Sequence, residues 1–197
     1  MKAFVAFDIE KTGCLNYTHP IVSIGYVVGD SKGNLFEKKK INLLVKWPQC
    51  DLKGINCYGD FEPRCWDEFW SKRPSELLKA LQQNALSQEE GLKQFAEFLN
   101  SLELKYESIV FLSDNASFDI AALDVNLERY AKRNPLRYST TGKYRSLLPP
   151  DDLFETLSVE QQNELSKKYI TPFVVHDHDP SNDAEFIYRQ YIAYLHR

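Results

Sequence analysis

Residues 3–13 have the sequence AFVAFDIEKTG, an apolar run that breaks off at KTG. Val, Ile and Phe favour strands, and a short apolar run bounded by turn residues is typical of a buried strand. The sequence therefore predicts a central strand over residues 3–9. Asp8 and Glu10 lie two positions apart at its end, and the alternation of a strand places both carboxylates on the same face.

Two carboxylates this close on an apolar strand are costly, because like charges raise each other's pKa. A divalent cation between them removes the cost, and Mg²⁺ prefers oxygen ligands of this kind. Asp119 follows a second predicted apolar strand, and Asp183 begins the last predicted helix, so both are placed to join the same site. Taken singly, each acid has a simpler explanation: a solvated strand end, or a helix N-terminus, which favours acids.

The segment HDHDPSNDAEF, residues 176–186, holds two histidines and four acidic residues. It is poorly suited to a core, because buried charges need partners. His178 lies five positions before Asp183, and a histidine that titrates near neutral pH can accept a proton from a metal-bound water. Alone, His178 is most simply a surface-loop histidine.

The rest of the chain shows strand and helix patterns in alternation. Further strands are expected at residues 21–28, 35–45 and 108–114. Helices are expected at residues 74–83, 87–102, 118–133, 158–169 and 183–195. The loops are expected to include residues 147–154, and residues 47–74 form a Trp- and Cys-rich irregular insertion. This order predicts an α/β fold in which helices cover a mixed sheet.

Three local signals mark helix starts in these segments. Ser87 with Glu90, and Ser158 with Gln161, have the spacing of capping boxes. Asn182 is a candidate cap for the last helix, since Asn is among the favoured residues there.

Composition limits the class of protein. The chain has 197 residues, of which 43% are hydrophobic, and this length suits one compact domain over residues 1–197 better than two. The 24 basic and 28 acidic residues give a net charge of −4, so the chain as a whole lacks the basic footprint of a simple nucleic-acid-binding module. An enzyme that grips nucleic acid locally is compatible with this balance.

The sequence indicates an intracellular protein, cytoplasmic or nuclear, without a membrane span. The first apolar run is too short for a signal peptide, and no stretch reaches membrane-spanning length. The four cysteines form no C-x-x-C pair, so we expect reduced thiols. A structural zinc held by Cys50, Cys57 and Cys65 is the less favoured alternative.

The acids and the histidine also form an ordered pattern: D-x-E, then N-x-x-F-D, then H-x-x-x-x-D. The segments FDIEKTG (7–13), NASFDIAAL (115–123) and HDPSNDA (178–184) resemble the three exonuclease motifs of the DEDDh, or DnaQ-like, 3′–5′ exonuclease superfamily. Its four acids fall on positions Asp8, Glu10, Asp119 and Asp183. Its histidine falls on His178, so we expect the remaining loop residues to lie outside the chemistry: His176, Asp177 and Asp179.

The resemblance implies an RNase H-like mixed five-stranded sheet flanked by helices. It also implies a metal-dependent enzyme that hydrolyses phosphodiester bonds and releases 5′-mononucleotides. Two Mg²⁺ ions, for which Mn²⁺ would substitute, would lie about 3.5–4 Å apart. Asp8 would bridge both ions and Asp119 would hold one of them. Glu10 and Asp183 would complete the other, with His178 as general base.

The resemblance also suggests substrate contacts. Glu10 and the backbone around Thr12 match the family's contact to the 3′-hydroxyl. Asn115 and Phe118 are candidates for contacts near the terminal base, although Phe118 is more simply a core residue. Lys143 and Arg145 lie among tyrosines and would steer the nucleic-acid backbone, or are ordinary loop residues.

Two departures from the family pattern are visible. Lys11 stands where the family often has a second Thr, and Pro180 interrupts the spacer of the third motif. The aromatic residues of the insertion are expected to pack it onto the sheet, or, less favoured, to wedge the terminal nucleotide: Trp66, Phe69 and Trp70. The basic run Lys38–Lys40 is interpreted as a solvated strand edge.

The expected partner is nucleic acid with a free 3′ end, and single-stranded DNA or a 3′ overhang, as in DNA repair, is slightly favoured. An exoribonuclease of the same family is one alternative. A non-catalytic DnaQ-like binding module, or an interaction protein that displays the insertion, are the others. A polymerase or repair partner would be a separate chain, and the oligomeric state is not predicted.

Overall fold

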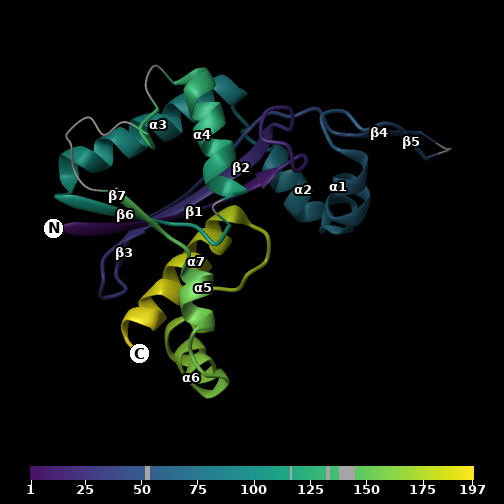
Figure 1. Ribbon diagram of the computed structural model, residues 1–197. Coiled ribbons are helices and arrows are strands. Elements are labelled where there is room, and N and C mark those ends of the chain that lie inside the picture. Colours follow the sequence, from purple (N-terminus) through teal and green to yellow (C-terminus); the bar gives the residue numbers. More distant parts are fainter. Residues whose placement is uncertain (52–53, 116, 132–133, 138–144) are drawn as a thin grey trace.

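The main sheet combines parallel and antiparallel strands (Figure 1). The structure, a computed structural model, describes residues 1–197 except 52–53, 116, 132–133 and 138–144. The strand order is β3-β2-β1-β6-β7, from β1 (Lys2–Lys11), β2 (Ile21–Gly29), β3 (Leu35–Asn42), β6 (Ser108–Leu112) and β7 (Arg145–Leu148). β1 pairs antiparallel with β2 and parallel with β6. The predicted mixed α/β fold is confirmed.

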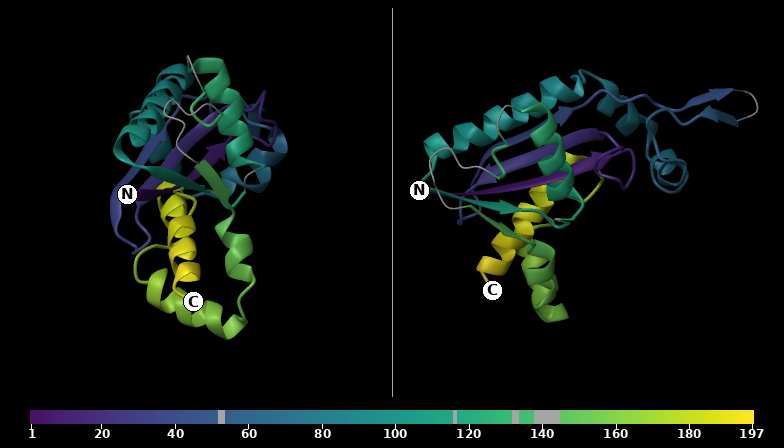
Figure 2. Two further views of the ribbon diagram at one scale, coloured as in Figure 1. Left: turned by 60° about the vertical axis from the view of Figure 1, so that its left-hand side comes forward. Right: turned by 45° about the horizontal axis from the view of Figure 1, so that its top comes forward.

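Helices cover both faces of this sheet (Figures 1 and 2). One face carries α3 (Gln88–Lys105) and α4 (Asp119–Tyr130), and the other carries α7 (Pro180–Leu195). The helices α5 (Pro150–Glu155) and α6 (Val159–Tyr169) pack against α7. No helix among the described residues is both long enough and apolar enough to cross a membrane.

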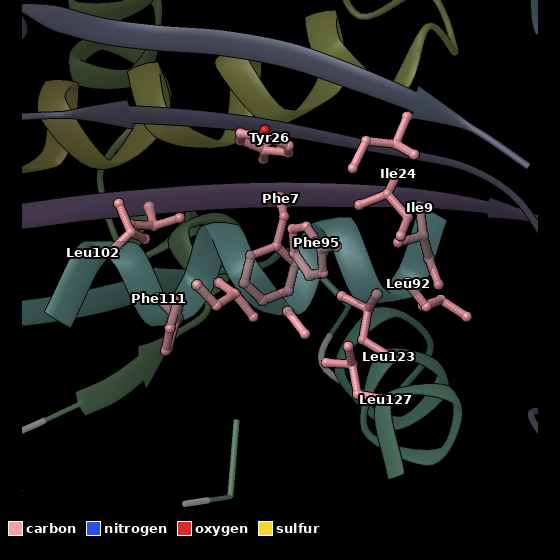
Figure 3. Packing of buried hydrophobic residues seen from close by; sticks show 14 of the residues in the cluster. Phe7, Ile9, Ile24, Tyr26, Leu92, Phe95, Leu102, Phe111, Leu123 and Leu127 are labelled. Carbon is pink, nitrogen blue, oxygen red and sulfur yellow. The ribbon is translucent and has the colours of Figure 1, made fainter. Parts of the chain in front are cut away.

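The alternation of β1 explains how the core forms. Phe7 and its odd-numbered neighbours lie in the core under α3 and α4, where the Phe7 ring is 6.4 Å from Phe95 and 5.8 Å from Phe111 (Figure 3). Phe4 and Ala6 lie in the second core, against α7. Because side chains alternate along a strand, the even-numbered Asp8 and Glu10 continue the α7 side of the sheet.

The insertion at residues 47–74 is more regular than predicted. A hairpin of β4 (Gln49–Asp51) and β5 (Gly54–Cys57) extends away from the sheet (Figure 2). It is followed by α1 (Pro63–Glu68) and a 3₁₀ turn, η1 (Trp70–Lys72), and then by α2 (Ser75–Gln82). Cys14, Cys57 and Cys65 are free thiols, as expected, and the Cys50 side chain lies outside the described part.

The helix starts confirm two predictions and correct others. Capping boxes form at Ser87 and Ser158. Residues 147–154 are not a loop, because β7 runs to Leu148 and α5 begins at Pro150, a residue that suits the first helical position. For the same reason α7 begins at Pro180, so Asn182 is not its cap. The Asp179 side chain caps α7 by accepting the Ser181 N–H.

A glycine sets the position of α7 on the sheet. Gly25 in β2 is paired with Asp8 in β1. A Cβ atom at position 25 would lie 2.0 Å from the carbonyl carbon and oxygen of Pro180. Only a residue without a side chain allows this close approach, so Gly25 brings the start of α7 next to Asp8.

Candidate active site

The predicted acids converge at the ends of β1 and β6 and at the starts of two helices. Oxygen atoms of Asp8, Glu10 and Asp183 lie within 4.8 Å of one another. Asp8, Asp119 and Asp114 form a second such group, which shares Asp8 with the first. Asp114 was not among the predicted residues, although its position directly after β6 is where α/β sheets commonly place functional groups.

The cluster is buried and electrostatically unfavourable without a cation. Burial raises the pKa of Asp8, and the neighbouring charges of Glu10, Asp119 and Asp183 raise it further. Burial, with a contribution from the Asp183 charge, also raises the pKa of Glu10. Burial raises the pKa of Asp119 to about 8 and that of Asp183 to about 6.

The hydrogen bonds of these acids leave one oxygen without a partner. Asp119 accepts a hydrogen bond from the Ser113 hydroxyl at 2.8 Å, and Asp183 accepts one from the Asp177 N–H at 3.1 Å. Asp8 Oδ2 is buried, and no described residue donates a hydrogen bond to it. An unpartnered buried carboxylate oxygen between other carboxylates fits a hard divalent cation, because such ions take oxygen ligands.

Both histidines of the third motif lie at this cluster. His178 has a positive φ of 64°, and its Nδ1 lies 3.9 Å from Glu10 Oε1. His176 was interpreted as a loop residue outside the chemistry; it does lie in the loop before α7, and its Nε2 is 3.3 Å from Asp183 Oδ2. The two rings are 4.9 Å apart, and both line the same cavity. The sequence did not predict this proximity, because a loop has no fixed period from which side-chain direction follows.

The cavity has a volume of about 360 Å³, and two phenylalanines are among the residues that line it. Phe118 at the start of α4 lines it, with Lys11 Nζ 3.9 Å from the ring centre. Phe69 from the insertion lines it as well, and its ring contacts His178 at a centroid distance of 5.2 Å. Arg73 lies over the Phe69 ring with its Cζ 4.0 Å from the ring centre.

A hydrogen bond connects the insertion to the first motif. Trp70 is buried, and its Nε1–H donates a hydrogen bond to the Lys11 carbonyl at 2.9 Å. Trp66 packs beside it in a separate apolar cluster under β2. The predicted packing role of these aromatics is confirmed for Trp66 and Trp70, whereas Phe69 also faces the cavity.

The predicted substrate residues differ in where they lie. Asn115 lines the cavity, but its side-chain oxygen accepts the Phe118 N–H at 3.1 Å and so shapes the start of α4. Thr12 is fully buried, and it is not among the described residues that line the cavity. Lys143 lies outside the described residues, as does the side chain of Arg145, whose backbone belongs to β7.

The basic run on β3 is not simply a solvated edge. Lys38 donates to Asn182 at 2.7 Å and to Glu185 at 2.9 Å, both on α7. Lys40 forms an ion pair with Asp179 at 2.5 Å, the residue that caps α7. These contacts hold the start of α7 against β3, next to the histidines.

The whole chain matches a known family of nucleases. Residues 3–194 match the family model described as the 3′–5′ exoribonuclease Rv2179c-like domain. The chain belongs to this family. As a member of the Rv2179c-like family it is a 3′–5′ exonuclease, a hydrolase that acts on nucleic acid.

Individual relatives of this Rv2179c-like chain carry related names. It is 25% identical over 183 residues to the 3′–5′ DNA exonuclease Cap18 of Escherichia coli, which covers 93% of this chain and 86% of that protein. A zinc-bound complex of E. coli ExoI with single-stranded DNA matches 99% of the chain with a TM-score of 0.61 and 12% identity. ExoI bound to a dA13 oligonucleotide matches with a TM-score of 0.59.

The ExoI likeness shows that the two proteins share a fold. This chain spans 40% of the ExoI chain. The shared part is the RNase H-like α/β unit that carries the acids here. The DEDDh resemblance deduced from three short motifs is thus confirmed by comparisons that cover nearly the whole sequence.

Proposed function

We propose that this protein removes nucleotides one at a time from the 3′ end of single-stranded DNA and releases 5′-mononucleotides. The observation that carries the proposal is the carboxylate cluster around Asp8, whose buried Oδ2 has no hydrogen-bond donor among the described residues. Such a cluster is costly in a folded protein unless it serves to bind cations.

The two groups of acids suggest where metal ions are held. Asp8, Glu10 and Asp183 would hold one Mg²⁺, and Asp8, Asp119 and Asp114 would hold the second. When bound, such a pair stabilises the negative charge on the attacking and leaving oxygens of a phosphodiester. Mn²⁺, which also prefers oxygen ligands, would substitute.

His178 is the proposed general base. Its ring lines the cavity beside Glu10. Burial lowers its pKa, and the charge of Arg73 lowers it further, so the neutral ring that accepts a proton persists below the usual range. His176 would instead orient Asp183, to which its Nε2 is 3.3 Å.

Glu10 is the proposed contact for the terminal 3′-hydroxyl. Its carboxyl group is 11% exposed and lines the cavity, and burial with the Asp183 charge raises its pKa. Phe118 and Phe69 would border the terminal nucleotide, since base–aromatic stacking tolerates any base.

The choice between DNA and RNA rests on relatives whose names differ. Cap18, which is named a DNA exonuclease, aligns with 93% of this chain. The family model is named for an exoribonuclease, so trimming of RNA is the second candidate. A non-catalytic binding module is disfavoured, because such a module has no need for the four buried acids.

The test uses 5′-labelled single-stranded DNA and RNA of matched sequence. With Mg²⁺ or Mn²⁺ we expect a ladder that shortens from the 3′ end, and the DNA ladder to advance faster. EDTA and Asp8→Ala should both abolish it. A faster RNA ladder would move the proposal to the second candidate.

A fold control separates loss of chemistry from loss of structure. Asp8→Ala should keep the wild-type circular dichroism spectrum and bind the same oligonucleotides. If the folded wild-type protein binds the strands and cleaves neither, the enzyme proposal is wrong and the binding module replaces it.

A further inference from the structure

Arg73 is a positively charged residue near the acids, and it has no ionic partner among the described residues. It follows η1 at the end of the insertion and is half-buried. Its Nε is shielded from solvent and has no hydrogen-bond partner in the described part of the chain. No described side chain forms an ion pair with it, although its charge acts on both Glu10 and His178.

The other cations near the cluster are engaged. Lys11 donates to Asn16 at 2.5 Å and lies over Phe118. Lys40 is paired with Asp179 at the cap of α7. Arg73 differs from both, because its guanidinium stacks on Phe69 and its hydrogen-bonding capacity is unused among the described residues.

The contact with Phe69 holds the guanidinium in place without using its donors. The Cζ of Arg73 lies 4.0 Å from the centre of the Phe69 ring, and that ring contacts His178 at 5.2 Å. An aromatic face attracts a guanidinium and holds it in place. Arg73 is thereby held against Phe69, which lines the cavity beside His178, although Arg73 itself is not among the described residues that line it.

A guanidinium held in this way suits a phosphate. Its planar set of N–H donors matches two phosphate oxygens, and bonds between such charged groups are stronger than neutral ones. The carboxylates beside it are the groups proposed to hold metal ions, so they are not free to serve as its permanent partner. An incoming strand supplies the missing anion.

We propose that Arg73, presented by Phe69, binds one backbone phosphate of the nucleic acid strand and so positions its 3′ end at the acids. Arg73 is a substrate-positioning residue in this proposal. The proposal deepens the function proposed above and rests on it, because it requires that a strand enter this cavity.

The first experiment measures binding without turnover. An Asp8→Asn protein is titrated with labelled single-stranded DNA and RNA over a series of salt concentrations. Adding Arg73→Ala should weaken binding about tenfold, as expected for a charged hydrogen bond. The slope of log affinity against log salt should fall by about 0.7, the value for one lost contact to a single-strand phosphate.

Arg64→Ala is the matched control. Arg64 belongs to the same insertion, has the same charge and is 69% exposed, and it pairs weakly with Glu62 at 3.9 Å. We expect Arg64→Ala to leave the salt slope unchanged. Arg73→Lys should restore part of the affinity, because it keeps the charge and loses the paired donors.

The second experiment identifies the phosphate. Oligonucleotides with a single neutral methylphosphonate at each of the positions near the 3′ end are bound to the Asp8→Asn protein. One position should weaken binding, and Arg73→Ala should remove that penalty, since coupled groups are not additive. An unchanged salt slope, or full additivity at every position, overturns the proposal and leaves Arg73 as an electrostatic support for Glu10.

The two proposals fail in different ways. If the Asp8→Asn protein binds no strand and the wild type hydrolyses none, the proposed function fails and the role of Arg73 fails with it. If the wild type hydrolyses the strand and Arg73→Ala matches it in KM, kcat and salt slope, only the role of Arg73 fails.

Discussion

Asp8 illustrates how much a single residue can reveal about a site. It lies on a strand whose other positions are all buried except Lys2, and its Oδ2 has no hydrogen-bond donor among the described residues. Burial of this kind normally selects against a carboxylate. Under the proposed function, the position of Asp8 follows from the metal ions that it would hold.

The two histidines allow a residue-scale test. His178→Asn should lower kcat by about 100-fold or more, the usual contribution of a general base. Asn tolerates the positive φ at this position, so the loop should keep its shape. The measurement is steady-state hydrolysis of the labelled strand with saturating Mg²⁺.

His176→Asn is the matched control, two residues away in the same cavity. We expect a loss of less than about tenfold, because His176 contacts Asp183 and is not the proposed proton acceptor. If the two variants lose activity in the opposite order, the roles assigned to the two rings must be exchanged.

The start of α7 is an element whose position depends on charges from β3. Lys40→Ala removes the ion pair with Asp179 and should lower kcat/KM several-fold, because His178 and Asp183 flank that cap. Unfolding free energy should change by less than about 1 kcal/mol, as for partly exposed ion pairs. Kinetics and urea unfolding on the same samples measure both.

Lys39→Ala serves as the comparison for this element. Lys39 is adjacent and 61% exposed, and it pairs with Glu37 on its own strand and not with α7. Equal losses of activity in the two variants would show that general charge, and not the anchoring of α7, is responsible.

Gly25 in β2, the strand next to β3, also sets the position of α7. Gly25→Ala should destabilise the protein by about 2 kcal/mol, the usual range for overpacking, and should lower activity by shifting α7 away from Asp8. Urea unfolding and single-strand hydrolysis check the two effects.

Gly91→Ala is the control for Gly25→Ala. Its new methyl group would meet the end of the flexible Leu43 side chain, and Ala favours the helix there. We expect a smaller loss of stability and wild-type activity. A catalytically normal Gly25→Ala protein would contradict the proposed dependence of the site on this contact.

At the element scale, the sequence predicted the helices and strands that have a regular hydrophobic period. β1 and α3 carry unambiguous patterns, and Ser87 marks the start of α3. Pro150 and Pro180 were interpreted as breaks, although proline also suits the first turn of a helix.

In the site, too, the sequence predicted the features that follow from a regular period and missed those that depend on how loops fold. The spacing of Asp8 and Glu10 follows from strand geometry and could be predicted. The positions of Arg73, Phe69 and His176 could not, because they depend on how the insertion and a loop fold back on the sheet, and no local period reports this.

The charge cluster should influence the stability of the whole molecule. Burial raises the pKa of Asp119 from 3.8 to about 8 in the folded protein. The folded state therefore holds a proton that the unfolded chain releases, and this contribution to stability is lost as pH rises from about 4 to about 8. Asp183 acts in the same direction up to a pH of about 6.

Asp119→Asn should consequently be more stable than the wild type at pH 8 in EDTA, and the difference should shrink toward pH 4. Adding Mg²⁺ should stabilise the wild type more than the variant, since bound cations relieve the repulsion. Thermal unfolding across pH measures both. Glu128→Gln, an exposed acid on the same helix, should show no such pattern.

The first strand, β1, lies against the last helix, α7, although the two segments are far apart in the sequence. A chain emerging from the ribosome only as far as α6 still lacks Asp183 and both motif histidines. Since domains fold as units once their parts are present, the residues proposed for catalysis come together only after α7 has been synthesised.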